Sequence, residues 1–176
     1  MKMYRCRICG ETYLGYEAPS QCPFCGAHAR LMVEPRDYPA GIDDIQPTEV
    51  ERADIEAAIQ VERSNTRFYL GMAQRHDNDT LRSAYKRLSR IESEHCSLFC
   101  KLVGMPKPDD LAVPAETSGD WRTDIAESLE REKRASALYA EFLGRATSPR
   151  VREVFDAVAA VERDHIDFDA LAATYV

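Results

Sequence analysis

Apolar residues recur at helical spacing over most of the chain after about residue 48. Ile, Leu, Val, Phe and Ala stand three and four positions apart with charged residues between them, as in helices that bury one face. The pattern predicts four long helices, over about 48–74, 80–103, 120–145 and from 149 to the end. Residues 1–35 lack this pattern and hold four of the six cysteines.

Two short polar segments separate the helices into pairs. "HDNDT" lies between the first two helices, with Asp79 or Thr80 as the expected N-cap. "TSPR" lies between the last two, with Ser148 as the expected N-cap and Pro149 at the first helical position. Such short loops predict that each pair is an antiparallel hairpin.

The connection between the two pairs is long and rich in proline. Residues 104–119 read "GMPKPDDLAVPAETSG". Extended, they reach about 50 Å, whereas the predicted third helix is about 39 Å long. The connection can therefore cross the bundle from end to end and start the third helix parallel to the second. Long crossovers of this kind are typical of ferritin-like bundles.

The predicted fold is mainly α. We expect a small cysteine-rich metal domain over residues 1–35, a proline-containing linker over 36–47 and a ferritin-like four-helix bundle over 48–176.

Charge and composition limit the possible partners. The chain of 176 residues carries a net charge of −7, which argues against nucleic acid and against an anionic membrane surface as partners. No apolar run approaches the length of a membrane span, and the first ten residues lack the apolar core of a signal peptide. We therefore expect a cytoplasmic protein whose cysteines are reduced or bind metal.

The amino-terminal cysteines have the spacing of a metal site. "CRIC" and "CPFC" form a C-x2-C-x12-C-x2-C arrangement in which each pair can grip one ion from a tight turn. A glycine follows each pair and allows positive φ where the turn closes around the sulfur. Four thiolates suit zinc or a single iron ion, and the spacing alone leaves these two open. The predicted ligands are Cys6, Cys9, Cys22 and Cys25.

The helical region contains an internal repeat. Acidic residues, tyrosines and histidines of the first helix pair recur in the second pair, each 70 positions later, and the apolar residues keep the same register. Two copies of one helical hairpin therefore form the bundle. The repeated polar residues are Glu62 and Glu132, Tyr69 and Tyr139, Glu92 and Glu162, and His95 and His165.

The repeat predicts a site for two metal ions. Residues three apart on a helix share a face, so Glu92 projects with His95 and Glu162 with His165. Four buried carboxylates without counter-charge would be highly unfavourable, and two divalent cations balance them. One Glu from each of two helices and Glu-x-x-His from each of the other two is the ligand set of dimetal carboxylate bundles. Carboxylate and imidazole suit iron or manganese. We expect Tyr69 and Tyr139 to orient carboxylates by hydrogen bonds.

The remaining cysteines interrupt the repeat. Cys96 and Cys100 stand where the second copy has Ile166 and Ala170, so we interpret them as small apolar residues.

The segment "YRCRICGETYLGYEAPSQCPFCGA" resembles rubredoxin in the shortened form found in rubrerythrins. With the cysteine module ahead of the bundle, the whole chain resembles the reverse rubrerythrins. The resemblance implies a non-haem di-iron peroxidase that reduces hydrogen peroxide to water with electrons relayed through the cysteine-bound iron. It implies that Glu62 and His95 bind one iron, Glu132 and His165 the other, and that Glu92 and Glu162 bridge them.

The resemblance also implies an upstream reductase or rubredoxin as the electron donor, linked to NAD(P)H. We further expect a homodimer or homotetramer, because a linker of this kind can bring one subunit's cysteine site close to a neighbour's dimetal site.

The chain departs from rubrerythrins in one respect. Rubrerythrins carry an extra glutamate on the third helix, whereas the positions one turn from Glu132 are Ser128, Leu129, Ala135 and Ser136. This leaves a ferroxidase or iron-handling protein as an alternative, and a zinc-loaded structural or binding protein as a third possibility. Glu127 and Glu130 fall outside the repeat register and are not expected to bind metal.

Overall fold

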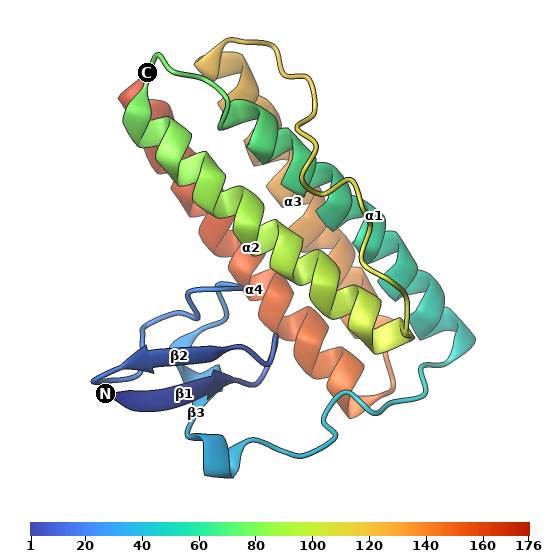
Figure 1. Ribbon diagram of the computed structural model, residues 1–176. Helices are drawn as coiled ribbons and strands as arrows, with labels where there is room; N and C mark the ends of the chain where they lie inside the picture. Colours follow the sequence, from blue (N-terminus) through green and yellow to red (C-terminus); the bar gives the residue numbers. More distant parts are fainter.

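The computed structural model describes all 176 residues and consists of a four-helix bundle with a small three-stranded sheet at its side (Figure 1). The predicted mainly α fold is confirmed, with helix ends close to those expected. None of the helices is long and apolar enough to cross a membrane. The helices are α1 (Glu49–Met72), α2 (Asp79–Val103), α3 (Trp121–Arg145) and α4 (Pro149–Ala172), and a 3₁₀ turn η3 (Ala173–Tyr175) ends the chain.

The predicted N-caps are confirmed only in part. The N-cap of α2 is Asn78, whose side chain accepts a hydrogen bond from Leu81 N, so the expectation of Asp79 or Thr80 is wrong by one or two positions. Asn is as good a cap as Asp, and the Asp-rich turn offered several candidates. Ser148 does precede α4, but its side chain makes no capping bond.

The crossover between α2 and α3 runs along α1, and α3 starts at the far end of the bundle, parallel to α2 (Figure 1). Asp110 in the crossover accepts hydrogen bonds from Arg63 Nη2 at 2.7 Å and Arg67 Nη1 at 2.8 Å. The backbone N–H of Ala115 donates to the carbonyl of Arg67. These contacts hold the long segment on the bundle surface and give the ferritin-like connectivity.

The amino-terminal module is a small antiparallel sheet with the strand order β2-β1-β3. It contains β1 (Lys2–Cys6), β2 (Thr12–Gly15) and β3 (Met32–Val33), with the short 3₁₀ turns η1 (Ala29–Leu31) and η2 (Pro35–Asp37). Gly10 and Gly26 adopt φ of 86° and 76°, and their N–H groups donate to the carbonyls of Cys6 and Cys22. The predicted role of glycine after each cysteine pair is confirmed.

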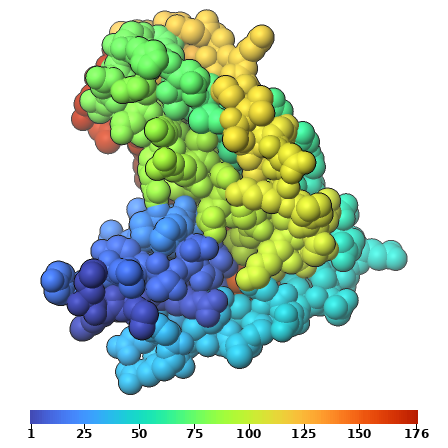
Figure 2. All heavy atoms as spheres, in the orientation of Figure 1, coloured from blue at the N-terminus to red at the C-terminus, as the bar shows by residue number.

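The module packs directly against the bundle of its own chain, where Figure 2 shows its atoms against those of α2. Ile8 of the module belongs to the same buried apolar cluster as Phe99 of α2 and Phe155 of α4. Arg150 of α4 donates to the Ile8 carbonyl at 2.8 Å and pairs with Asp43 of the linker at 2.7 Å. His28 of the module contacts Asp164 of α4 at 2.7 Å. Apolar burial and polar contacts together hold the module in place.

Glu51 ties together the first turns of α1 and α4. One carboxylate oxygen accepts from the backbone N–H and the hydroxyl of Thr48, the N-cap of α1, in a capping box. The other accepts from the backbone N–H groups of Thr147 at 2.8 Å and Ser148 at 2.6 Å. Burial would raise the pKa of Glu51, but the backbone N–H groups of Ser148, Thr48 and Thr147 lower it to about 2.

We predict that Glu51→Gln destabilises the protein by about 2–3 kcal/mol at pH 7, because a charged acceptor of several amides is lost. The folded-state pKa lies below the ordinary 4.5, so this stabilisation is fully present above pH 4.5 and is lost as the pH falls towards 2. Denaturant unfolding of both proteins at pH 7 and pH 3 measures the difference. Glu49→Gln, at an exposed position of the same turn, is the matched control. An equal gap at both pH values would contradict the assignment.

Candidate metal centres

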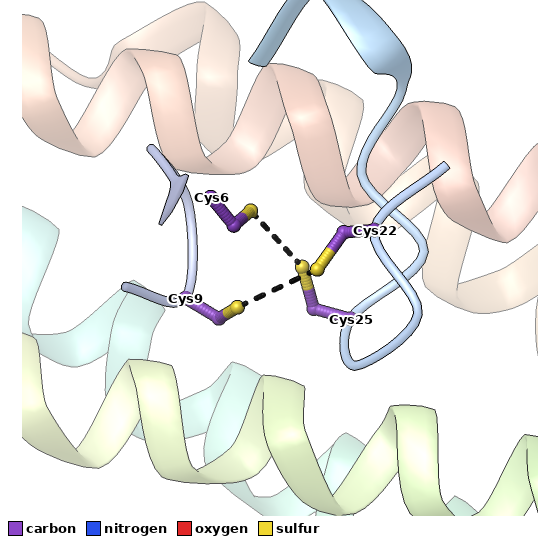
Figure 3. A group of neighbouring side chains, drawn as sticks. All are labelled: Cys6, Cys9, Cys22 and Cys25. Carbon is purple, nitrogen blue, oxygen red and sulfur yellow. Dashed lines mark hydrogen bonds between the residues drawn. The ribbon is translucent and has the colours of Figure 1, made fainter. Parts of the chain in front are cut away.

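The four amino-terminal cysteines converge with their sulfur atoms facing one another (Figure 3). Cys6 Sγ lies 3.7 Å from Cys25 Sγ, and Cys9 Sγ lies 3.8 Å from Cys22 Sγ. A tetrahedral ion with metal–sulfur bonds of about 2.3 Å has sulfur atoms about 3.8 Å apart. No disulfide joins any of the four thiols. The cluster therefore has the spacing of a four-cysteine metal site.

All six predicted carboxylate and imidazole residues meet at the centre of the bundle. Each of the four helices contributes, and the side chains are almost completely buried. They form two overlapping groups of ligand atoms that share Glu92 and Glu162. The first group adds Glu62 and His95, and the second adds Glu132 and His165.

The two shared glutamates each face both histidines. Glu92 places Oε2 3.5 Å from His95 Nδ1 and Oε1 3.0 Å from His165 Nδ1. Glu162 places Oε1 3.5 Å from His95 Nδ1 and Oε2 3.2 Å from His165 Nδ1. By contrast, Glu62 approaches only His95, at 3.6 Å, and Glu132 only His165, at 3.5 Å. Two carboxylates therefore face both imidazoles, and the other two each face one imidazole.

The donor set of the cluster fits divalent metal ions. Several oxygen and nitrogen atoms directed into it are buried and lack any hydrogen-bond partner, among them both oxygens of Glu92 and Nδ1 of His95. Buried polar atoms of this kind are costly unless something binds them. Carboxylate oxygens with imidazole nitrogens are the donors that iron and manganese prefer. The cysteine and carboxylate clusters together support iron binding by this protein.

Burial and the close approach of like charges shift the pKa values within the cluster. Burial and then the Glu92 carboxylate raise the pKa of Glu62 well above its usual range, and burial and the Glu162 carboxylate do the same for Glu132. Burial alone would lower the pKa of His95, but the facing Glu62 and its neighbours raise it well above the usual range.

The two tyrosines bind carboxylates across the bundle. Tyr69 of α1 donates to Glu132 of α3, and Tyr139 of α3 donates to Glu62 of α1. Each hydroxyl binds one oxygen of its carboxylate, and the other oxygen faces a histidine of the cluster. The expected hydrogen bonds to carboxylates are present, and each links one copy of the repeat to the other.

One side chain connects the two clusters. His95 directs Nδ1 at the carboxylates and donates from Nε2 to the backbone carbonyl of Cys25, at 2.8 Å. Cys25 belongs to the cysteine cluster, so a single imidazole and one peptide group span the distance between the two sites. This contact depends on how the module packs, and the sequence pattern did not reveal it.

A second buried polar group was also missed. Tyr85 donates to Asp169 at 2.7 Å, and Ser128 donates to the same carboxylate at 2.6 Å. Burial raises the pKa of Asp169 to about 6. The repeat carried a signal for this group, because the residues 70 positions away are all apolar and buried: Phe155, Phe99 and Ala58.

The residues set aside in the sequence lie outside both clusters. Glu127 pairs with Arg131 and Glu130 with Lys133 on the surface of α3. Cys96 is buried, and burial raises the pKa of its thiol to about 12, so the thiol stays protonated and apolar in character.

Fold and sites together define a class of protein: a ferritin-like four-helix bundle with a carboxylate–histidine cluster, joined to a four-cysteine module. Comparisons with known proteins agree with this class.

Residues 4–31 match the family described as "Rubrerythrin, rubredoxin-like domain". The chain is 29% identical over 153 residues to reverse rubrerythrin-1 of Clostridium acetobutylicum, an alignment that covers 81% of this chain and 82% of that protein. No solved structure gives a significant match. The resemblance to rubrerythrins, with the rubredoxin-like domain first, is confirmed.

We predict that ferrous iron stabilises the folded protein through the carboxylate cluster. Added anaerobically at about 100 times its dissociation constant, it should contribute about 2.7 kcal/mol through one site. Glu92→Ala should remove this stabilisation and leave the iron-free protein at least as stable, since it removes one buried anion. Thermal unfolding with and without iron measures both effects. Glu94→Ala, two residues away and outside the cluster, is the matched control; an equal response from both variants would argue against the site.

Proposed function

We propose that this protein is a rubrerythrin-like non-haem di-iron peroxidase that reduces hydrogen peroxide to water, with electrons relayed through a rubredoxin-type iron at Cys6, Cys9, Cys22 and Cys25. Such an enzyme is an oxidoreductase, and its electrons come ultimately from NAD(P)H through an upstream reductase or rubredoxin. Similarity to a reverse rubrerythrin over four fifths of the chain supports the proposal.

One observation carries the proposal furthest. The His95 imidazole faces the carboxylate cluster with one nitrogen and donates to the Cys25 carbonyl with the other. A storage or purely structural protein has no need to join a cysteine site to a dimetal site through one ligand. A peroxidase does need this, because its spent centre must be reduced again after each turnover.

Each residue has a definite role in this proposal. Glu62 and His95 would hold one iron, Glu132 and His165 would hold the other, and Glu92 and Glu162 would bind both. When bound, a pair of iron ions there would supply the two-electron chemistry that breaks the peroxide O–O bond, and iron held by the cysteines would supply electrons one at a time. Reduction of H₂O₂ takes two electrons and two protons and yields two water molecules. Tyr69 and Tyr139 fix the terminal carboxylates, and their hydroxyls hold protons beside the centre.

A ferroxidase or iron-handling function is the second candidate. The specific observation in its favour is that rubrerythrins carry an extra glutamate on the third helix, whereas no carboxylate stands one turn from Glu132. The residues at those positions are Ser128, Leu129, Ala135 and Ser136. The resulting six-residue set is closer to that of bacterioferritin. Against this candidate stands the cysteine module, which iron storage in a cage does not require.

We predict that Glu92→Ala abolishes peroxide turnover while leaving the cysteine iron coloured, because Glu92 faces both histidines and has no contact with the thiols. The protein is reduced anaerobically, peroxide is added, and the return of the red ferric–thiolate colour is followed. Wild-type colour should return rapidly, and the variant's colour slowly or not at all. A colourless preparation with zinc in the cysteine site, or turnover by the variant at the wild-type rate, would refute the peroxidase.

We also propose a homodimer or homotetramer. In the chain described here, the module lies against its own bundle, so the relay needs no second subunit for its contacts. Exchange of modules between subunits would preserve the same contacts. Light scattering of the iron-loaded protein should give a dimer or tetramer, whereas a large cage-like particle would favour the ferroxidase candidate. A monomer with full activity would contradict the assembly.

A further inference from the structure

The carboxylate cluster is almost completely buried, and His165 is its most exposed residue. Glu92, His95, Glu132 and Glu162 have no exposed surface, and Glu62 is 1% exposed, whereas His165 is 5% exposed. The two histidines also differ on the side away from the cluster. His95 Nε2 donates to the Cys25 carbonyl, but the buried Nε2 of His165 has no partner. An unpartnered buried nitrogen marks a place where a ligand can bind.

A pocket of about 260 Å³ reaches His165 from outside. It lies between α2, α4 and the module, and its wall is largely apolar. Its polar lining includes Arg87 of α2, Gln21 of the module and Asp164 of α4, and Gln21 donates a hydrogen bond to Asp164 at 2.7 Å. The apolar lining comes from Ala84, Leu88, Ile91, Val161 and Phe168.

Module and bundle build this pocket together. Gly26 lines it and lies so close to Val161 that an added Cβ would meet that side chain at 2.7 Å. The pocket therefore has its present shape only while the module is docked, which also keeps the cysteine cluster beside His95.

The lining indicates the kind of molecule that fits. His165 lines the pocket, and its unpartnered Nε2 can hydrogen-bond an oxygen atom, while the apolar side chains suit a hydrocarbon group. Since a water molecule occupies about 30 Å³ of liquid, the pocket has room for about eight waters, more than hydrogen peroxide needs.

We propose that this pocket is the entrance to the dimetal site and that it binds small organic hydroperoxides as substrates. The proposal rests on the peroxidase function argued above. The reaction ROOH + 2e⁻ + 2H⁺ → ROH + H₂O breaks the O–O bond and leaves the hydrocarbon group as an alcohol. Its electrons come from the same NAD(P)H-linked donor protein through the cysteine site. The hydrocarbon group rests against Leu88, Ile91 and Phe168 while the peroxide end enters past His165.

A larger cavity of about 490 Å³ lies between α1 and α3 and offers a matched comparison. Its lining includes Ser64, Asn65 and Ala135 but none of the six cluster residues. Filling it should therefore leave access to the cluster unchanged.

Blocking the two cavities one at a time tests the proposal. Ala84→Trp fills the pocket at His165 from a partly exposed position, and Ser64→Trp fills the larger cavity from an exposed one. With tert-butyl hydroperoxide, kcat/KM should fall about tenfold or more in Ala84→Trp, the scale of excluding a small group from an apolar pocket. The loss with hydrogen peroxide should be smaller, and Ser64→Trp should match wild type with both substrates.

A second readout is independent of turnover. Apolar cavities bind xenon, so crystals of the iron-loaded protein under xenon pressure should show it beside His165 in wild type and Ser64→Trp but not in Ala84→Trp. Retained cysteine-iron colour and helical circular dichroism confirm that the variants are folded.

The possible results distinguish failure of this proposal from failure of the peroxidase function on which it rests. If wild type turns over neither peroxide, the peroxidase function falls and this proposal falls with it. If wild type reduces hydrogen peroxide but not tert-butyl hydroperoxide, or if Ala84→Trp keeps full activity with both, only the entrance and its substrate class are overturned. Absence of xenon beside His165 in wild type also overturns the apolar pocket.

Discussion

Four carboxylates buried at the centre of a helical bundle are the constraint on which this structure depends. They cannot stay there as bare anions, because buried charges without compensation are highly unfavourable. A pair of divalent cations balances them fully. The layer divides the apolar interior into two parts, one that continues into the cysteine module and one around Tyr69, Tyr85 and Trp121. Helix packing on both sides thus fixes the ligand positions before any ion binds.

The helices and the six cluster residues were predictable because the same pattern occurs in both copies of the internal repeat. A single Glu-x-x-His is weak, but Glu92 with His95 and Glu162 with His165 in one register leave little room for coincidence. The four-cysteine spacing is similarly specific, since it fixes two tight turns and their glycines. Local chemistry also placed the crossover, whose length and prolines exclude a short hairpin. Sequence alone could not identify the N-cap of α2, because three adjacent residues, Asn78, Asp79 and Thr80, are all suitable N-cap residues.

What sequence reasoning missed depends on how the module meets the bundle. The bond from His95 to the Cys25 carbonyl joins segments 70 residues apart through a backbone atom, which no side-chain pattern encodes. The Asp164 carboxylate of α4 is likewise hydrogen-bonded to His28 and Gln21 of the module. The Tyr85–Asp169–Ser128 group was detectable in principle: the matching positions of the other copy, Phe155, Phe99 and Ala58, are apolar, so polar residues at these sites needed an explanation.

The two halves of the bundle have diverged around a shared ligand set. At one end, Tyr139 packs among Phe99, Phe142 and Phe155; at the other, Tyr69 packs on Tyr85 beside the Asp169 carboxylate. The surroundings of the two histidines differ in the same way. His95 is closed off by the module and serves contact with the cysteine site, while His165 keeps a free nitrogen next to a pocket. A symmetric dimetal site can be approached by small molecules along two equivalent routes, one beside each histidine. Docking one small module on one face removes that equivalence, because it covers one histidine and forms a wall beside the other. In the proposed peroxidase, electrons and oxidant would then reach the same centre from different sides, so the oxidant would not need to displace the reductant.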